Sequence, residues 1–203
     1  MSCSADPIVV TADSYEAHAS EYASYRADRS SIRPRIDRFA ELAKPGGAVL
    51  DIGCGPGVDT ATLAQAGLRA VPMDIAAAMT RLATRYVPGS TVRADSRNLP
   101  FTSNSFDAVW ANASLLHLPK EAVGVCVLEI LRVLSPGGIF FAAMQVGSDN
   151  AIESNRPGAS FAAPRFFARY ELDEWVACIE GPGFEVIESR ATASWIHTFA
   201  RKP

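Results

Sequence analysis

Short apolar runs alternate with longer mixed segments through the middle of the chain. Five runs have the length and composition of buried strands, over residues 48–52, 69–73, 91–94, 106–111 and 139–146. Between them, residues 58–66, 76–86 and 120–134 combine apolar and polar positions as helices do. Strands that are apolar on both faces and alternate with helices indicate a parallel sheet that is covered on both sides. This pattern predicts a doubly wound α/β fold with right-handed crossovers.

The two flanks depart from this alternation. Residues 13–28 and 31–43 read as two polar, arginine-containing helices before the first strand. Residues 147–170 contain glycine and proline positions with few periodic apolar residues, which is typical of an insertion. A helix over 171–180 and strands over 184–189 and 194–200 follow. We expect one domain over 1–203, with cap helices over 13–43 and a lid-like insertion over 147–170.

Composition narrows the class of protein. The chain has 203 residues, a formal net charge of −3 and 48% hydrophobic residues, which fits one globular domain and argues against a nucleic-acid partner. Its four cysteines contain no C-x-x-C pair, so we expect neither a disulfide framework nor a metal site. No run is long and apolar enough for a membrane span, and the N-terminus lacks the pattern of a secretory leader. We therefore expect a cytoplasmic protein with no membrane partner, and the sequence carries no indication of an oligomeric state.

A glycine-rich turn follows the first strand. Residues 49–57 read Val-Leu-Asp-Ile-Gly-Cys-Gly-Pro-Gly, so Gly53, Gly55 and Gly57 stand at alternate positions before the helix over 58–66. Glycine is needed where the backbone takes a positive φ or approaches a ligand more closely than a Cβ allows. A turn of this kind, between a strand and a helix of an open α/β sheet, predicts a site for a nucleotide-like cofactor.

Three carboxylates stand where predicted strands end. Asp51 ends the first strand, Asp74 the second, and Asp95 follows the third. The carboxyl ends of the strands line the ligand crevice of such a sheet. A carboxylate placed like Asp74 accepts hydrogen bonds from both hydroxyls of a ribose, and such charge-assisted bonds are strong. We expect Asp95 and Ser96 to bind an adenine edge, with the Asp95 carboxylate accepting the exocyclic amine.

Ordered motifs over about residues 45–146 resemble those of a known family. They are the turn over 49–57, Asp74, Ala94-Asp95 with the segment 98–101, and the segments 106–109 and 131–138. This set is similar to the class I S-adenosylmethionine-dependent methyltransferases, in the small-molecule branch that resembles ubiquinone and menaquinone methyltransferases. The resemblance implies a Rossmann-like, doubly wound α/β sheet of seven strands in the order 3-2-1-4-5-7-6, with strand 7 antiparallel. It also implies transfer of a methyl group from S-adenosylmethionine to a small-molecule acceptor by in-line displacement.

The resemblance also assigns residues to the cofactor. The glycine turn would pass under its methionine part, Asp51 would face its amino group, Asp74 would hold the ribose, and Ile75 and Leu99 would press on the adenine. Arg26 lies four residues after Tyr22 on one helical face and would reach the cofactor carboxylate. The cofactor-binding residues implied in this way are Tyr22, Arg26, Asp51, Gly53, Cys54, Gly55, Gly57, Asp74, Ile75, Asp95, Ser96, Ala111 and Asn112.

The acceptor side leaves alternatives open. No catalytic residue is assigned: His117 is the best-placed general base, but a role in the pocket wall is the competing interpretation. The segment 161–170 holds four aromatic residues and two arginines. These residues either form an aromatic-walled acceptor pocket, with Arg165 or Arg169 binding an acidic group, or simply pin the insertion to the sheet edge.

Two other functions are weighed against methyl transfer. A nicotinamide-dependent oxidoreductase would carry the fingerprint G-x-G-x-x-G, but Val58 stands where its last glycine would fall. A protein that binds S-adenosylmethionine or S-adenosylhomocysteine without catalysis would keep the same cofactor residues, and only turnover distinguishes it.

Overall fold

The computed structural model describes residues 6–26, 30–87, 89, 91–154 and 161–203. Within these ranges the helices are α1 (Pro7–Ala17), α2 (Ala19–Tyr25), α3 (Arg33–Leu42), α4 (Val58–Gln65), α5 (Ala77–Ala83), α6 (Lys120–Val133) and α7 (Leu172–Glu180), with short 3₁₀ helices η1 (Ser30–Ile32) and η2 (Leu115–His117). The strands are β1 (Ala48–Ile52), β2 (Arg69–Asp74), β3 (Val92–Arg93), β4 (Phe106–Asn112), β5 (Leu134–Val146), β6 (Asn150–Glu153), β7 (Arg165–Tyr170), β8 (Glu185–Ala191) and β9 (Trp195–Arg201).

The central sheet confirms the predicted topology. Strands β3, β2, β1, β4 and β5 lie side by side in that order, and each pairs with its neighbours in parallel. β9 then pairs antiparallel with β5, and β8 pairs antiparallel with β9. With β8 and β9 counted as the sixth and seventh strands, the order is 3-2-1-4-5-7-6 with strand 7 antiparallel.

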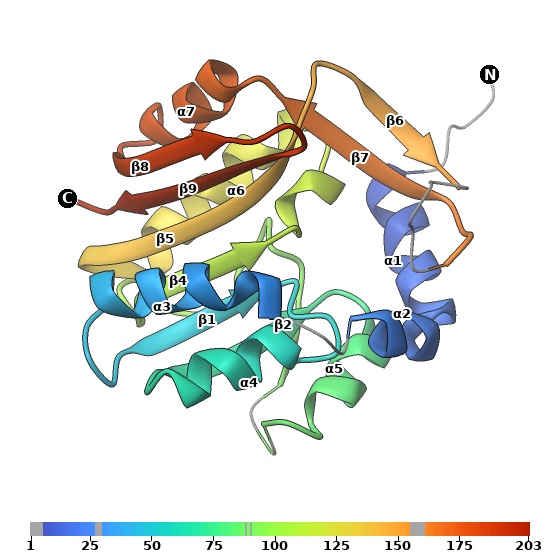
Figure 1. The fold of residues 1–203 in the computed structure, drawn as a ribbon, viewed down its shortest axis with the longest axis horizontal. Coiled ribbons are helices and arrows are strands. Elements are labelled where there is room, and N and C mark those ends of the chain that lie inside the picture. Colours follow the sequence, from blue (N-terminus) through green and yellow to red (C-terminus); the bar gives the residue numbers. More distant parts are fainter. Residues whose placement is uncertain (1–5, 27–29, 88, 90, 155–160) are drawn as a thin grey trace.

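The core lies on both faces of this sheet because successive strand residues point to opposite sides. In β4, Trp110 packs edge-to-face against Phe39 of α3, with ring centroids 5.1 Å apart, and shares its buried cluster with Leu63 of α4. The next residue back, Val109, belongs to the cluster on the other face with Ile130 of α6. Figure 1 shows α3 and α4 in front of the sheet and α6 behind it. The uninterrupted apolar strands of the sequence are explained by this two-sided burial.

The insertion adds a two-stranded ribbon that the sequence did not reveal. β6 and β7 pair antiparallel, and β7 also pairs in parallel with Gln145 and Val146 at the end of β5. The ribbon extends past the sheet toward α1 (Figure 1). Residues 155–160 of the predicted insertion lie outside the described residues.

The N-terminal helices begin and end differently from the prediction. Instead of one helix over 13–28, α1 begins at Pro7, stops at Ala17, and α2 starts again at Ala19. The Asp6 side chain accepts a hydrogen bond from the N–H of Ile8, and a proline suits the first helical position, so this start has a local cause. Residues 27 and 28 of the predicted helix lie outside the described residues. None of the helices formed by the described residues could cross a membrane, since none combines the required length and hydropathy.

Candidate functional site

The glycine turn has the backbone that its sequence predicts. Gly53, Gly55 and Gly57 all have positive φ, at 68°, 54° and 90°. A Cβ on Gly53 would lie 2.3 Å from the Cβ of Ser114, and one on Gly57 would lie 2.8 Å from the Cα of Ala83 in α5. The turn is therefore packed tightly against the segment that follows β4 and against α5.

Asp74, the last residue of β2, is bonded directly to this turn. Its Oδ2 accepts a hydrogen bond from the N–H of Gly55 at 3.0 Å, and its Oδ1 accepts one from the N–H of Ala76 at 2.9 Å. Burial raises the pKa of Asp74 to about 6, although these two backbone donors act to lower it. Each carboxylate oxygen keeps a second lone pair, so the group still accepts hydrogen bonds from a ligand.

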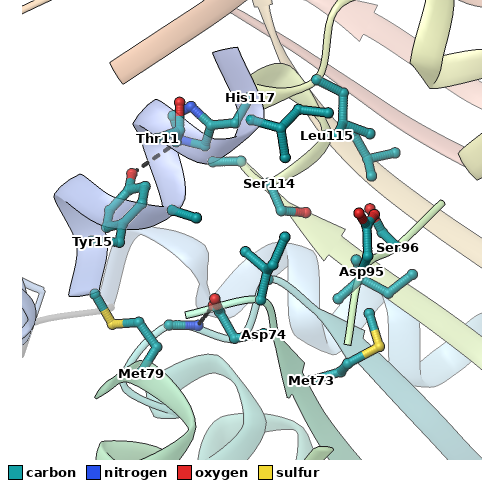
Figure 2. A pocket seen from close by; sticks show the side chains of 18 of the residues that line it. Thr11, Tyr15, Met73, Asp74, Met79, Asp95, Ser96, Ser114, Leu115 and His117 are labelled. Carbon is teal, nitrogen blue, oxygen red and sulfur yellow. Dashed lines mark hydrogen bonds between the residues drawn. The ribbon is translucent and has the colours of Figure 1, made fainter. Parts of the chain in front are cut away.

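A pocket opens at the carboxyl ends of β1, β2 and β4, where the arrowheads in Figure 1 point toward α1 and α2. It spans about 780 Å³, including space open to solvent at its mouth, which suits a small-molecule ligand. Its walls come from α1, the glycine turn, the end of β2, residues 94–96 and the segment that runs from β4 into η2. Figure 2 shows Asp74, Asp95, Ser96 and Ser114 around it.

One buried polar atom of this pocket indicates a ligand. The Ser114 hydroxyl is buried and has no hydrogen-bond partner among the described residues. In Figure 2 it points into the cavity between Asp74 and Asp95. A buried hydroxyl without a partner is costly, and a ligand group that bonds to it would remove that cost.

A second, smaller hollow adjoins the first. Tyr22, Gly53, Gly55 and Asn112 line both of them, and Arg26, Cys54 and Asp59 line the smaller one. Arg26 donates from Nε to the Tyr22 hydroxyl at 3.1 Å, so the two side chains lie together as their spacing of four residues indicates. Asp59, in the first turn of α4, is 7% exposed and accepts hydrogen bonds from Asn112 Nδ2 at 2.8 Å and from Trp110 Nε1 at 3.2 Å. The hollow therefore presents a cation and a carboxylate together.

The same region of the chain matches known proteins. Residues 50–142, which run from β1 into β5 and include the glycine turn, Asp74 and Asp95, match the family model described as a methyltransferase domain. Over this segment the chain is therefore similar to methyltransferase domains.

Curated proteins similar to this chain match about half of it. The demethylmenaquinone methyltransferase of Corynebacterium urealyticum is 41% identical over 107 residues, which cover 52% of this chain and 44% of the relative. The cycloartenol-C-24-methyltransferase 1 of Oryza sativa is 34% identical over 131 residues, covering 58% of this chain and 38% of the relative. The chain thus spans less than half the length of these relatives.

Solved structures show how widely the fold is shared. The 1,6-didemethyltoxoflavin-N1-methyltransferase of Burkholderia thailandensis, solved with S-adenosylhomocysteine bound, has a TM-score of 0.74 and 23% identity over 96% of this chain and 88% of its own. The cyclase SpnF has a TM-score of 0.73 and 17% identity over 95% of this chain and 94% of its own. Likeness at this level concerns the fold alone, and the activity has to be argued from the site.

The structure brings most of the implied cofactor residues together. The larger pocket is lined by Tyr22, Gly53, Gly55, Asp74, Ile75, Asp95, Ser96 and Asn112, and the smaller one adds Arg26 and Cys54. Three implied residues line neither. Asp51 is buried and accepts a hydrogen bond from the Thr60 hydroxyl at 2.5 Å, Ala111 lies in the core, and Gly57 packs on α5. Leu99 also lies in the core and lines neither pocket.

Asp95 has a partner that the sequence did not suggest. Its two oxygens accept hydrogen bonds from the Arg97 side chain, with the shortest contact 2.6 Å from Nη2, and Oδ1 also accepts from the Arg97 N–H. Burial alone would raise the pKa of Asp95, but the bonds from Arg97 hold it below its usual range. An adenine amine would therefore share Asp95 with Arg97.

The cover of the pocket comes from α1, which overlaps the cap helices predicted over 13–43 but begins earlier, at Pro7. Thr11 accepts a hydrogen bond from the N–H of Phe166 at 2.9 Å, and Ser14 donates to the carbonyl of Pro164 at 2.5 Å. Glu16 accepts from the N–H of Ala78 at 2.7 Å, at the start of α5. These bonds fix α1 between the insertion and α5, and Thr11 and Ser14 are buried there.

The aromatic segment after residue 160 mainly pins the insertion to the rest of the fold. Phe161, Phe166 and Phe167 are buried. Arg169 pairs with Asp149 and Glu153, which removes it as a free anion-binding group. Arg165 is buried among aromatic rings, and neither pocket is lined by residues of this segment. In the described part of the chain, no cluster of three or more histidine, cysteine, aspartate or glutamate residues is arranged to hold a metal ion.

Proposed function

We propose that the protein transfers a methyl group from S-adenosylmethionine to a small-molecule acceptor by in-line displacement. The observation that carries this proposal is that the glycine turn, Asp74 and the pair Asp95–Ser96 line one pocket, within the segment that matches the methyltransferase domain. Similarity to a demethylmenaquinone methyltransferase supports an acceptor of metabolite size.

The pocket residues fit the parts of this cofactor one by one. The Asp74 carboxylate, held by two backbone N–H groups, is placed to accept both ribose hydroxyls. Ile75 and the segment 94–96 offer an apolar face and a polar edge to an adenine. The smaller hollow suits the amino-acid end, with Arg26 facing a carboxylate and Asp59 an ammonium group. Asp59 takes the role that the sequence gave to Asp51.

The protein's contribution to the reaction is positioning. When bound, the cofactor supplies an electrophilic methyl group on its sulfonium. Tyr22, Gly53, Gly55 and Asn112 line both hollows, so they are placed to surround the junction between the nucleoside and the amino-acid end. Holding a nucleophile in line with the methyl–sulfur bond lowers the barrier by about 7–11 kcal/mol at most. No covalent protein intermediate is needed.

We further propose that residues 1–203 act as one methyltransferase domain, with α1 to α3 as its cap and β6 and β7 beside the acceptor side. The acidic charge balance supports a metabolite rather than a nucleic acid as the acceptor. The cysteines Cys54, Cys126 and Cys178 are free in the structure, which supports a reducing cytoplasm as the place of action.

Binding and turnover test the proposal separately. We expect S-adenosylhomocysteine at a hundredfold excess over its Kd to stabilise the fold by about 2.7 kcal/mol, which raises Tm by about 5–10 °C. Asp74→Ala should abolish most of this shift. A Tm shift with NADH and none with S-adenosylhomocysteine would refute the proposal. Binding without any release of S-adenosylhomocysteine from S-adenosylmethionine, across a panel of acceptors, would instead favour a binding protein.

A further inference from the structure

Two pocket residues from distant parts of the chain form a hydrogen-bonded pair. The Tyr15 hydroxyl of α1 lies 3.0 Å from Nε2 of His117 in η2, and both side chains line the larger pocket. Figure 2 shows the Tyr15 hydroxyl pointing toward the His117 ring, with a dashed line between them. Their rings meet edge to face, with centroids 5.4 Å apart.

The second nitrogen of His117 decides where its proton sits. Nδ1 lies 2.7 Å from the main-chain carbonyl of Phe166, and a carbonyl oxygen only accepts hydrogen bonds. Nδ1 therefore carries the hydrogen, and in the neutral ring Nε2 is an acceptor that faces the Tyr15 hydroxyl. The carbonyl also orients the ring and would stabilise an imidazolium, as the third member of a catalytic triad does.

The charged and titratable groups around the pair favour a relay over a permanent phenolate. Burial raises the pKa of Tyr15, so its hydroxyl stays protonated. Tyr22 from α2 acts in the same direction, while Arg26 and Arg165 of β7 oppose it. The Arg165 guanidinium lies 5.8 Å from the centre of the Tyr15 ring, and its Nε has no hydrogen-bond partner among the described residues. A positive charge in this place stabilises a hydroxyl that briefly gains negative character.

We propose that Tyr15 and His117 form a proton relay for an acceptor that is methylated on a hydroxyl oxygen. The inference rests on the proposed function and deepens it. A lone pair of the acceptor oxygen forms the new O–CH₃ bond, and the S–CH₃ bond breaks with its electrons staying on sulfur. The acceptor proton passes to the Tyr15 oxygen as the Tyr15 proton passes to Nε2 of His117. Tyr15 touches the acceptor and is the catalytic residue, whereas His117 acts through it.

The test uses two naphthalene acceptors that differ in ionisation. In 1,4-dihydroxynaphthalene, kept reduced, the hydroxyls are neutral at neutral pH, whereas the enol of 2-hydroxy-1,4-naphthoquinone is already ionised. With the neutral acceptor we expect Tyr15→Phe and His117→Gln to lower kcat about 10²–10⁴-fold and to abolish the acidic limb of its pH profile, because the relay needs the neutral ring of His117. With the ionised acceptor both variants should stay within a few-fold of wild type. Tyr86→Phe, at an exposed tyrosine outside the site, is the matched control.

Equal losses with both acceptors, or no loss with either, would overturn the relay and leave a purely structural link between α1 and η2. Binding of S-adenosylhomocysteine separates this result from failure of the proposed function, because the relay predicts an unchanged Kd in both variants. A second measurement needs no turnover. In ¹⁵N spectra of histidine-labelled protein, His117 should be neutral with its hydrogen on Nδ1, and a ring protonated on Nε2 alone would overturn the relay.

Discussion

Acidification should weaken binding of S-adenosylhomocysteine through one carboxylate, Asp74. Its pKa is raised to about 6 by burial, and a ribose diol donates its hydrogen bonds to the ionised form. If only that form binds, a pKa near 6 leaves about 90% of the sites competent at pH 7 and about 10% at pH 5. The Kd measured by calorimetry should therefore rise about tenfold between pH 7 and pH 5, which is close to 1.4 kcal/mol.

The stability of the ligand-free protein should change with pH in the direction opposite to the affinity. A carboxyl whose pKa is higher in the folded than in the unfolded state stabilises the fold fully below the unfolded value near 3.9, and this contribution is lost as the pH rises through about 6. Affinity for S-adenosylhomocysteine thus rises over the range in which the contribution of Asp74 to stability falls. A general loss of structure in acid would lower the affinity and the stability together. Opposite pH trends in these two quantities therefore identify Asp74 as the group responsible.

Two variants isolate the group responsible. Asp74→Asn should weaken binding at pH 7 and remove its dependence on pH between 5 and 7. Asp95→Asn is the matched control, because Arg97 holds the pKa of Asp95 below its usual range and that carboxyl does not titrate there. If Asp74→Asn retains the tenfold change, or if the wild type binds equally well at both pH values, the reasoning about Asp74 is refuted.

Two further predictions concern the turn and the smaller hollow. Gly53→Ala and Gly46→Ala both place an alanine at a φ of +68°, but only the Cβ at position 53 meets another atom, Ser114 Cβ at 2.3 Å. Urea denaturation should therefore show a loss of about 1–2 kcal/mol for Gly46→Ala and about 1–3 kcal/mol more for Gly53→Ala; equal losses would contradict the close packing of the turn. Asp59→Asn should weaken S-adenosylhomocysteine several-fold in calorimetry and leave 5′-methylthioadenosine, which lacks the amino-acid end, unchanged. An equal loss of affinity for both ligands would show that Asp59 does not bind the amino-acid end.

The sequence predicted the central sheet well because its strands are buried on both faces. Val109 and Trp110 need apolar surroundings on opposite sides, so the run around them reads as a strand without any knowledge of its neighbours. The glycine turn and Asp74 were predictable for a similar reason. A backbone position with positive φ selects glycine, and a carboxylate at a strand end requires aspartate or glutamate there. Both requirements are local, so both are visible in the sequence.

The cover of the site could not be read in the same way. Thr11 and Ser14 are buried by hydrogen bonds to a segment about 150 residues away, and nothing in the local sequence predicts these partners. The start of α1 did leave a signal, since Asp6 followed by proline is a helix cap that the periodicity obscured. The hydrogen bonds from the Arg97 side chain to both oxygens of Asp95 depend on the backbone conformation between these two residues. The types of the two side chains do not determine that conformation.

A crystal structure of the complex with S-adenosylhomocysteine tests the central claim most directly. The account predicts the ribose hydroxyls on Asp74, the adenine between Ile75 and the segment 94–96, and the amino-acid end between Arg26 and Asp59. The ligand sulfur should then face the part of the pocket that Tyr15 and His117 line. Ligand density elsewhere on the sheet, or a ribose without contact to Asp74, would contradict it.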